Sequence, residues 1–455
     1  MTAALPPRAT LEALFAAALS AVDPATAVAR AFERASGGSG ALSIAGVPFS
    51  RESRFVVFAA GKAACPMAAA LEERLGDQVS RGLAVTKDGH ALPLRTLVTR
   101  EAAHPVPDAR GARAAVEALA LARSLRPEET LIVLLSGGAS ALLTAPPPGL
   151  PQVDLARTTA ALLAVGAEIE ELNCVRKHLG SVSGGRLASE ARGARVVALV
   201  ISDVIGDRLD VIASGPCTAD PTTFGDALAV LARHGLHERV PPTVVAYLEA
   251  GAQGKVPETP KPGDPRLRHV VSRVVAANRD ALEGALREAQ RRGLRAIVAT
   301  RELAGEARRA GERLAALTQA LRGDAPLLLL AGGETTVTVR GPGRGGRNQE
   351  LALAAAQALD GVPGVSLLAA GSDGSDGPTD AAGAFVDGGT VARGRALGLD
   401  ARHALLENDS YSFFAAEGGT FRTGPTRTNV MDLVLLLRDG TRRDAVFDSK
   451  PSLRA

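Results

Sequence analysis

Short runs of β-branched residues and leucine recur along the chain, each followed by a glycine-rich turn and then by a segment rich in alanine, leucine and arginine. The runs are almost wholly apolar, which predicts strands that are buried on both faces. Such strands alternating with helices are typical of parallel α/β sheets. We expect strands over residues 55–60, 130–135, 195–201, 270–276, 294–299, 327–331 and 365–370.

A polar stretch rich in proline and glycine, residues 251–265 (GAQGKVPETPKPGDP), interrupts this alternation. Its composition is typical of a linker. We therefore expect two α/β domains, residues 1–255 and residues 266–455, both of ordinary size. Because open α/β sheets bind ligands beyond the carboxyl ends of their strands, the glycine-rich turns predict a site in the cleft between the domains.

The composition narrows the classes of function. Of the 455 residues, 46% are apolar and 22% are charged, which is a globular balance. The 52 basic and 49 acidic residues leave a net charge of +3, which argues against binding of nucleic acid or of an anionic membrane. Aromatic residues make up 3%, with no tryptophan, so a base-stacking platform is not expected.

Three widely spaced cysteines, Cys65, Cys174 and Cys217, show no metal-binding or disulfide spacing. They indicate a reducing compartment. The apolar run 11–22 has helical spacing, which favours an amphipathic first helix over a signal peptide. No apolar stretch is long enough to predict a membrane span. We expect a cytoplasmic protein, and the sequence leaves open whether it is a homo-oligomer.

Only six lysines occur in the chain, and Lys62 stands between a predicted strand and a helix over 66–75. A helix N-terminus attracts anions, and a lysine there adds a compact charge suited to phosphate. The spacing of a Walker A loop is missing. The alternative is a lysine that merely opens a helix.

Two further segments of the first half are candidate anion sites. Gly137, Gly138 and Ser140 follow a buried strand, where successive amides and hydroxyls bind phosphate or carboxylate, or simply form a capped turn. Arg176 and Lys177 lie together in NCVRKH, which is either an anion site or an exposed basic helix end.

Carboxylates follow the strand over 195–201. Asp203 and Asp207 lie close to its end, with Gly215 shortly after. A carboxylate in this position can hold Mg²⁺ or act as a general base toward a hydroxyl. The alternative is an aspartate that caps the next helix.

In the second half, Glu334 ends a strand, an alternating segment over 335–340 predicts an exposed strand, and a loop with Gly341, Gly343 and Gly346 opens a helix over 350–359. These glycines match GxGxxG, but no acidic residue lies about 20 residues further on, as a dinucleotide site requires. With Arg344 and Arg347 inside it, the loop predicts phosphate binding.

The run 372–380 (SDGSDGPTD) follows another buried strand. It lacks the final glutamate of an EF-hand loop. Asp373 and Asp376 are candidates to hold Mg²⁺ or to position a polyol, and the alternative is a solvated acidic turn. Together the candidate groups indicate phosphoryl transfer by positioning and charge neutralisation.

An ordered series of motifs resembles the class II glycerate 2-kinases, the family with a MOFRL C-terminal domain. The series covers nearly the whole chain from residue 11 to residue 437. Its members are GKAA (61–64), HPVPD (104–108), LLSGGASALL (134–143), NCVRKHL (173–179), SGGRLA (183–188), SDVIGD (202–207), IASGP (212–216), GGETTVTV (332–339), GGRNQELALA (345–354), GSDGSDGPTDAAGA (371–384), NDSY (408–411) and TGPTRTNVMDL (423–433).

The resemblance implies ATP-dependent phosphorylation of D-glycerate at its 2-hydroxyl, with Mg²⁺, by a protein with a Rossmann-like parallel-sheet N-terminal domain and a smaller α/β C-terminal domain. It implies Lys62, Arg347 and Asp203 as catalytic residues. We expect Asp203 and Asp207 to be the metal ligands. Our candidates for nucleotide or substrate binding are Gly137, Gly138, Ser140, Lys177, Gly215, Glu334, Asn348, Asp373 and Asp376.

The chain departs from the family pattern at Ser183, where many relatives carry lysine, and at Arg427 and Met431, which stand in place of glycine and asparagine. The alternative activity is an NAD(P)H-dependent hydroxypyruvate reductase, a label that some relatives carry. The missing acidic partner for ribose argues against it.

Overall fold

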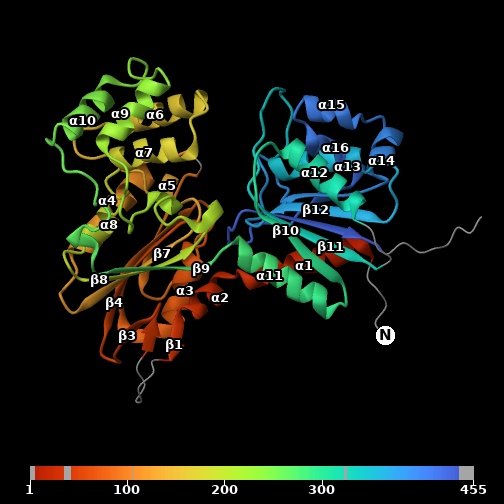
Figure 1. The fold of residues 1–455 in the computed structure, drawn as a ribbon. Helices are drawn as coiled ribbons and strands as arrows, with labels where there is room; N and C mark the ends of the chain where they lie inside the picture. The colour runs from red at the N-terminus through yellow and green to blue at the C-terminus, as the bar shows by residue number, and fades with distance from the viewer. Residues whose placement is uncertain (1–5, 35–41, 105, 322–324, 440–455) are drawn as a thin grey trace, which may run out of the picture. The chain divides into compact units, whose positions relative to one another are not determined.

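The computed structural model describes residues 6–34, 42–104, 106–321 and 325–439 (Figure 1). These divide into two compact units. The first unit consists of residues 20–280 and 426–431, and the second of residues 1–19, 281–425 and 432–455. The contact-based division therefore falls at Asp280 and Ala281, and each unit also includes a short segment from the other end of the chain.

The first unit is built on a six-stranded parallel sheet with the order β6-β5-β4-β7-β8-β9. This is the doubly wound order of Rossmann folds, which confirms the predicted N-terminal fold class. The strands are β4 (Arg54–Ala60), β5 (Val79–Lys87), β6 (Leu97–Ala102), β7 (Glu129–Leu135), β8 (Arg195–Ile201) and β9 (Val270–Ala276). A small antiparallel sheet precedes them, formed by β1 (Phe32–Arg34), β2 (Leu42–Ile44) and β3 (Val47–Phe49).

Helices cover both faces of this sheet, which explains the uniformly apolar strands. Val56 and Phe58 of β4 pack with α4 (Ala109–Arg123), α5 (Ala139–Leu142) and α8 (Arg186–Ser189). On β4, Phe55 and Val57 are equally buried, and α2 (Pro24–Arg30) and α3 (Ala64–Leu75) contact the sheet.

A second core holds four further helices together, which lie side by side in Figure 1: α6 (Gln152–Ala164), α7 (Ile169–Leu179), α9 (Phe224–Arg233) and α10 (Pro242–Ala252).

The segment predicted as a linker, residues 251–265, belongs to the first unit. Residues 251–265 lead back to the sheet of the first unit, where β9 pairs in parallel with β8. The middle of the segment is packed: Thr259 is 1% exposed and donates a hydrogen bond to Asp220. Proline and glycine are needed here for an irregular path within one unit, and the same composition also suits a linker.

The second unit has a six-stranded sheet of order β10-β11-β15-β12-β13-β14. Its strands are β10 (Arg295–Leu303), β11 (Leu327–Gly333), β15 (Asp432–Arg438), β12 (Val365–Gly371), β13 (Gly383–Asp387) and β14 (Thr420–Phe421). Only β10 and β11 are parallel, so the expectation of a parallel sheet is wrong here. The runs are apolar because both faces are buried, and burial does not report strand direction.

The helices of the second unit include α12 (Ala307–Ala320) and α13 (Arg347–Ala358), which pack on one face of the sheet with α15 (Ala401–Leu406) and α16 (Ser410–Glu417). In Figure 1, α1 (Pro7–Ala21) and α11 (Asn278–Arg291) lie on the opposite side, and α14 (Thr390–Ala396) lies beside α16. Phe15 of α1 meets Phe421 edge-on at 5.3 Å between ring centroids. No single helix in the described ranges is long and apolar enough to cross a membrane, although α1 and α2 taken as a bent pair pass on length and composition.

Candidate active site

Lys62 and Gly137 meet where the strand order of the first sheet reverses, between β4 and β7. The crevice at such a reversal is the usual ligand site of doubly wound sheets. The Lys62 amide donates to the Gly137 carbonyl at 2.9 Å, and the Ala63 amide donates to Ser136 Oγ at 3.0 Å. Hydrogen bonds therefore join the two turns that the sequence predicts to bind anions.

The glycines of these turns allow close packing. A Cβ on Gly61, whose φ is +121°, would lie 2.3 Å from Ser136 Oγ. A Cβ on Gly138, whose φ is +88°, would lie 3.1 Å from the His104 ring and 3.5 Å from Lys62 Cγ. The stem of Lys62 thus runs alongside Gly138.

Asp203 lies against the same turn. A Cβ on Gly137 would lie 2.1 Å from Asp203 Oδ2 and 2.4 Å from Asn429 Nδ2. Asn429 donates a hydrogen bond of 3.1 Å to this carboxylate oxygen. Lys62, Gly137 and Asp203 were expected in one site, and the structure brings all three together.

Asn429 was missed by the sequence reasoning, because its loop carries no chemical motif. Thr428 Oγ1 donates to the Val22 carbonyl at 3.0 Å, and Asn278 donates to the Val430 carbonyl at 2.8 Å. Arg427 and Met431 have φ values of +62° and +68°, which are unfavourable for side chains of their kind. Both are departures from the family pattern, so the substituted residues keep a left-handed backbone that suits glycine and asparagine.

The two residues expected as metal ligands differ in their surroundings. Asp207 forms an ion pair with Arg279, whereas Asp203 is half-buried beside Asn429. Within the ranges that the structure describes, no three acidic, histidine or cysteine side chains form a group that could hold a metal ion. Nucleotide-bound Mg²⁺ needs only one or two protein carboxylates. Asp203 therefore suits that task, and the ion pair with Arg279 argues against Asp207.

Lys177 lies in a buried charge network. Its side chain is 3% exposed, and Nζ is 3.4 Å from both Asp210 Oδ2 and Asp220 Oδ1. Burial opposes ionisation of Asp220, but Lys177 is the largest influence that lowers the pKa of this carboxyl below its ordinary value. These contacts argue against nucleotide binding by Lys177. Gly215 is likewise structural, since a Cβ there would lie 2.9 Å from the Asp210 carbonyl.

In the second unit, Arg347 at the start of α13 forms the centre of a charged group. It donates to Asp432 through Nε at 2.6 Å and Nη2 at 2.9 Å, and its Nη1 lies 2.7 Å from Glu334. Burial opposes the charge, but Asp432 and Glu334 together raise the pKa of Arg347 above its ordinary value. The Arg347 side chain is 35% exposed, so an outside ligand has partial access to it.

Strand direction places these three residues at one edge of the sheet. Asp432 begins β15 and pairs in register with Gly333 at the end of β11 and Gly371 at the end of β12. Because β15 runs against both neighbours, its start lies beside their ends. Asp432 was not among the candidates, although the motif TNVMDL contains it.

Asp376 and Asn348 lie behind this group. Asp376 is 2% exposed and accepts hydrogen bonds from the amides of Asn348 at 3.0 Å and Gln349 at 2.8 Å. It thereby caps the N-terminus of α13. Burial raises the pKa of Asp376 to about 6. Asn348 is 1% exposed and donates to the same carboxylate, so both residues have structural tasks that argue against ligand binding.

The glycine-rich loop also serves the fold. Arg340 and Gly341 donate their amides to Asn408 Oδ1 at 2.7 and 3.0 Å, and the Arg344 amide donates to Asp409 Oδ1 at 2.9 Å. A Cβ on Gly343 would lie 2.4 Å from Asp409 Cβ. These amides serve protein oxygens rather than phosphate.

Two other segments of the second half that the sequence analysis singled out are also described. Residues 335–340 form no strand, only an isolated bridge between Thr336 and Glu306. Asp373 Oδ1 accepts hydrogen bonds of 2.9 Å from the amide and hydroxyl of Ser375, which indicates a turn.

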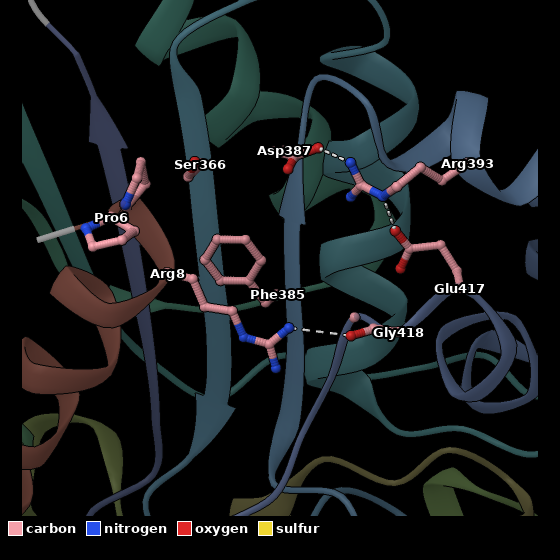
Figure 2. Close-up of a pocket in the computed structure, with 10 residues that line it drawn as sticks. Pro6, Arg8, Ser366, Phe385, Asp387, Arg393, Glu417 and Gly418 are labelled. Atoms are coloured by element: carbon pink, nitrogen blue, oxygen red, sulfur yellow. Dashed lines mark hydrogen bonds and ion pairs between the residues drawn. The ribbon is translucent and has the colours of Figure 1, made fainter.

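A cavity of about 340 Å³ in the second unit is not the candidate site (Figure 2). It lies at Ser366 and Asp387, the end of β12 and β13 away from Gly371. Its charges are matched: Arg393 bridges Asp387 and Glu417, and Arg8 donates to the Gly418 carbonyl at 3.2 Å.

The fold and these strand-end groups define a class: α/β proteins whose loops present Lys62 and Asp203 in one unit, and Arg347 in the other. Comparison with known proteins identifies the family within this class. Residues 10–249 match a domain of unknown function, DUF4147, and residues 327–432 match the MOFRL family.

The chain is 41% identical to a glycerate 2-kinase of Pyrococcus horikoshii, over 92% of this chain and 94% of that protein. It is 44% identical to a D-glycerate 2-kinase of Thermotoga maritima, over 84% and 90% of the two chains. A crystal structure of glycerate kinase from T. maritima matches with a TM-score of 0.80 at 39% identity, over 95% of this chain and 100% of that one. A relative in Agrobacterium vitis, 40% identical over 94% of each chain, is named a putative hydroxypyruvate reductase. The chain belongs to the class II glycerate kinase family.

Proposed function

We propose that this protein transfers the γ-phosphoryl group of ATP to the 2-hydroxyl of D-glycerate, giving 2-phosphoglycerate and ADP. The observation that carries the proposal is the joining of Lys62, Gly137 and Asp203 at the reversal of the first sheet. A cation beside a carboxylate is what transfer to a hydroxyl requires, because one group neutralises phosphate and the other accepts a proton.

The residues have distinct proposed tasks. Asp203 accepts the proton of the 2-hydroxyl as its oxygen attacks the γ-phosphorus, and Asn429 holds the carboxylate in place. Lys62 and Arg347 neutralise the charge of the transferred group. Asp432 and Glu334 orient the Arg347 guanidinium.

Magnesium enters as the partner of the nucleotide. Bound Mg²⁺ would neutralise phosphate charge. Asp203 is the carboxylate that would hold it, as the alternative to its task as the base. The location of the site in a cleft between the domains stays a prediction, as do contributions from Gly138 and Ser140.

The reductase alternative has less support. The glycines that match GxGxxG pack against residues 407–409 and against Asp376, and residues 334–340, directly before them, form no strand. The test compares ADP release from ATP and D-glycerate with oxidation of NADH or NADPH by hydroxypyruvate. Release of ADP that depends on glycerate supports the proposal. Reductase activity without ADP release overturns it.

A further inference from the structure

The first unit contains a cavity of about 380 Å³ next to the Ser140 turn. Residues from α6, α7 and the loops after β6 and α7 line it. One part is aliphatic, formed by Leu143, Leu155, Leu163 and Leu172. The other part is polar and includes Ser140, Ser183, Ser214 and Arg176.

Among the described residues of the lining, Arg176 is the single charged one, and no carboxylate accompanies it. Among the described residues, its guanidinium has no hydrogen bond or ion pair, and burial lowers its pKa. The neighbouring cations are matched, because Lys177 meets two aspartates and Arg186 Nη1 donates to the carbonyls of Lys177 and Gly180. A largely buried, unmatched guanidinium facing a cavity is suited to an anion.

The aliphatic part indicates what else the ligand carries. Val106 and Leu163 at the cavity are 71% and 59% exposed, so apolar surface is left open to water. Glycerate carries an oxygen on every carbon and gains little from such surface. A purine base has apolar faces, and a cavity of this volume accepts a nucleoside with a phosphate.

We propose that this cavity binds the nucleotide of the kinase reaction, with the base against Leu155 and Leu163 and a phosphate on Arg176. The inference rests on the proposed function for the identity of the nucleotide. Ser183 supplies a hydroxyl at this polar end. The pair Ser140 and Ser214, whose Oγ atoms are 3.0 Å apart, connects the cavity to the turn that also holds Lys62.

The test measures binding of ATP, adenosine and inorganic triphosphate by equilibrium dialysis without glycerate, so that it does not depend on turnover. Arg176→Met removes the charge and keeps the length of the side chain. Ala160→Phe places a ring into the aliphatic part from an exposed helix position. The matched controls are Arg157→Met and Ala164→Phe, on exposed positions of α6 outside the lining.

We expect Arg176→Met to weaken binding of ATP and triphosphate about tenfold or more and to leave adenosine almost unaffected. Ala160→Phe should weaken binding of ATP and adenosine but not of triphosphate. The KM for D-glycerate at saturating ATP should stay unchanged in both. Unchanged ATP affinity in both variants overturns the inference, and so does an effect confined to the KM for glycerate. If the wild-type protein binds ATP here but does not phosphorylate glycerate, the proposed function fails and the nucleotide site stands.

Discussion

Arg347 donates to both carboxylate oxygens of Asp432, at 2.6 and 2.9 Å, while its third nitrogen lies 2.7 Å from Glu334. This two-point contact fixes the plane of the guanidinium, which a lysine cannot reproduce. The contact therefore determines the direction in which the remaining donors point.

Arg347→Lys keeps the charge but loses this geometry. If Arg347 stabilises the transferred phosphoryl group, we expect kcat to fall by about 10²–10³-fold with a smaller change in KM. Steady-state ADP release measures both values. The control is Arg344→Lys in the same loop, whose guanidinium stacks on Tyr411 at 5.0 Å from the ring centroid. Equal activity in the two variants would contradict the assignment.

Gly137→Ala tests the contact between the turn and Asp203. The added methyl would lie 2.1 Å from Asp203 Oδ2, so the carboxylate has to move. We expect kcat to fall about 10²-fold or more, because proton transfer depends on the position of the base. Gly225→Ala is the control, since its methyl meets only Thr223 Oγ1, at 3.5 Å. A fully active Gly137→Ala protein would show that Asp203 is not needed in this position.

The substitution Lys177→Met tests whether Lys177 has a structural role or binds the nucleotide. The substitution leaves the buried Asp220 without this cation, whereas Asp210 keeps its ion pair with Arg208. We therefore expect the free energy of unfolding to fall by about 3–5 kcal/mol. Urea titration measures this change, and Lys177→Met/Asp220→Asn should recover part of the loss. ATP affinity of the folded protein should be retained. Lost ATP affinity at unchanged stability would instead restore the nucleotide role.

Asp376 should make stability depend on pH. Its folded-state pKa of about 6 lies above the ordinary value of 3.8, so between these values the folded protein holds a proton that the unfolded chain has released. The contribution of Asp376 to the free energy of unfolding is therefore complete below about pH 4 and falls as pH rises to about 6, by about 3 kcal/mol at most.

Asp376→Asn removes this titration. We expect the free energy of unfolding of the wild type, minus that of the variant, to fall from pH 4 to pH 6 and to stay constant above. A difference that is independent of pH would contradict the raised pKa.

The sequence predicts most of the buried framework. Strands such as β4, β7 and β8 are uniformly apolar because helices cover both faces, and their observed bounds agree with the predicted runs within a residue. The direction of β15 and its insertion between β11 and β12 were not predictable, because strand pairing is set by contacts distant in the chain.

The candidate site was predictable where function needs an unusual local pattern. Lys62 is a rare lysine at a strand-to-helix turn, and Asp203 follows a buried strand. Asn429 and Asp432 carry no such signal, because the fold alone brings them to their partners. Lys177 and Asp376 were predicted to bind ligands but have structural roles. Charged residues in basic or glycine-rich segments also form buried ion pairs and helix caps, and the sequence pattern is the same.

The position of the transferred phosphate tests the central claim most directly. Purified protein is incubated with ATP, Mg²⁺ and D-glycerate, and the product is observed by proton-coupled ³¹P NMR. Phosphate on the 2-oxygen couples to the single proton on carbon 2 and gives a doublet, whereas phosphate on the 3-oxygen couples to two protons and gives a triplet. We expect the doublet, with its formation abolished or strongly slowed in Lys62→Met but not in Lys255→Met, an exposed control. A triplet, or no phosphorylated glycerate at all, would contradict the account.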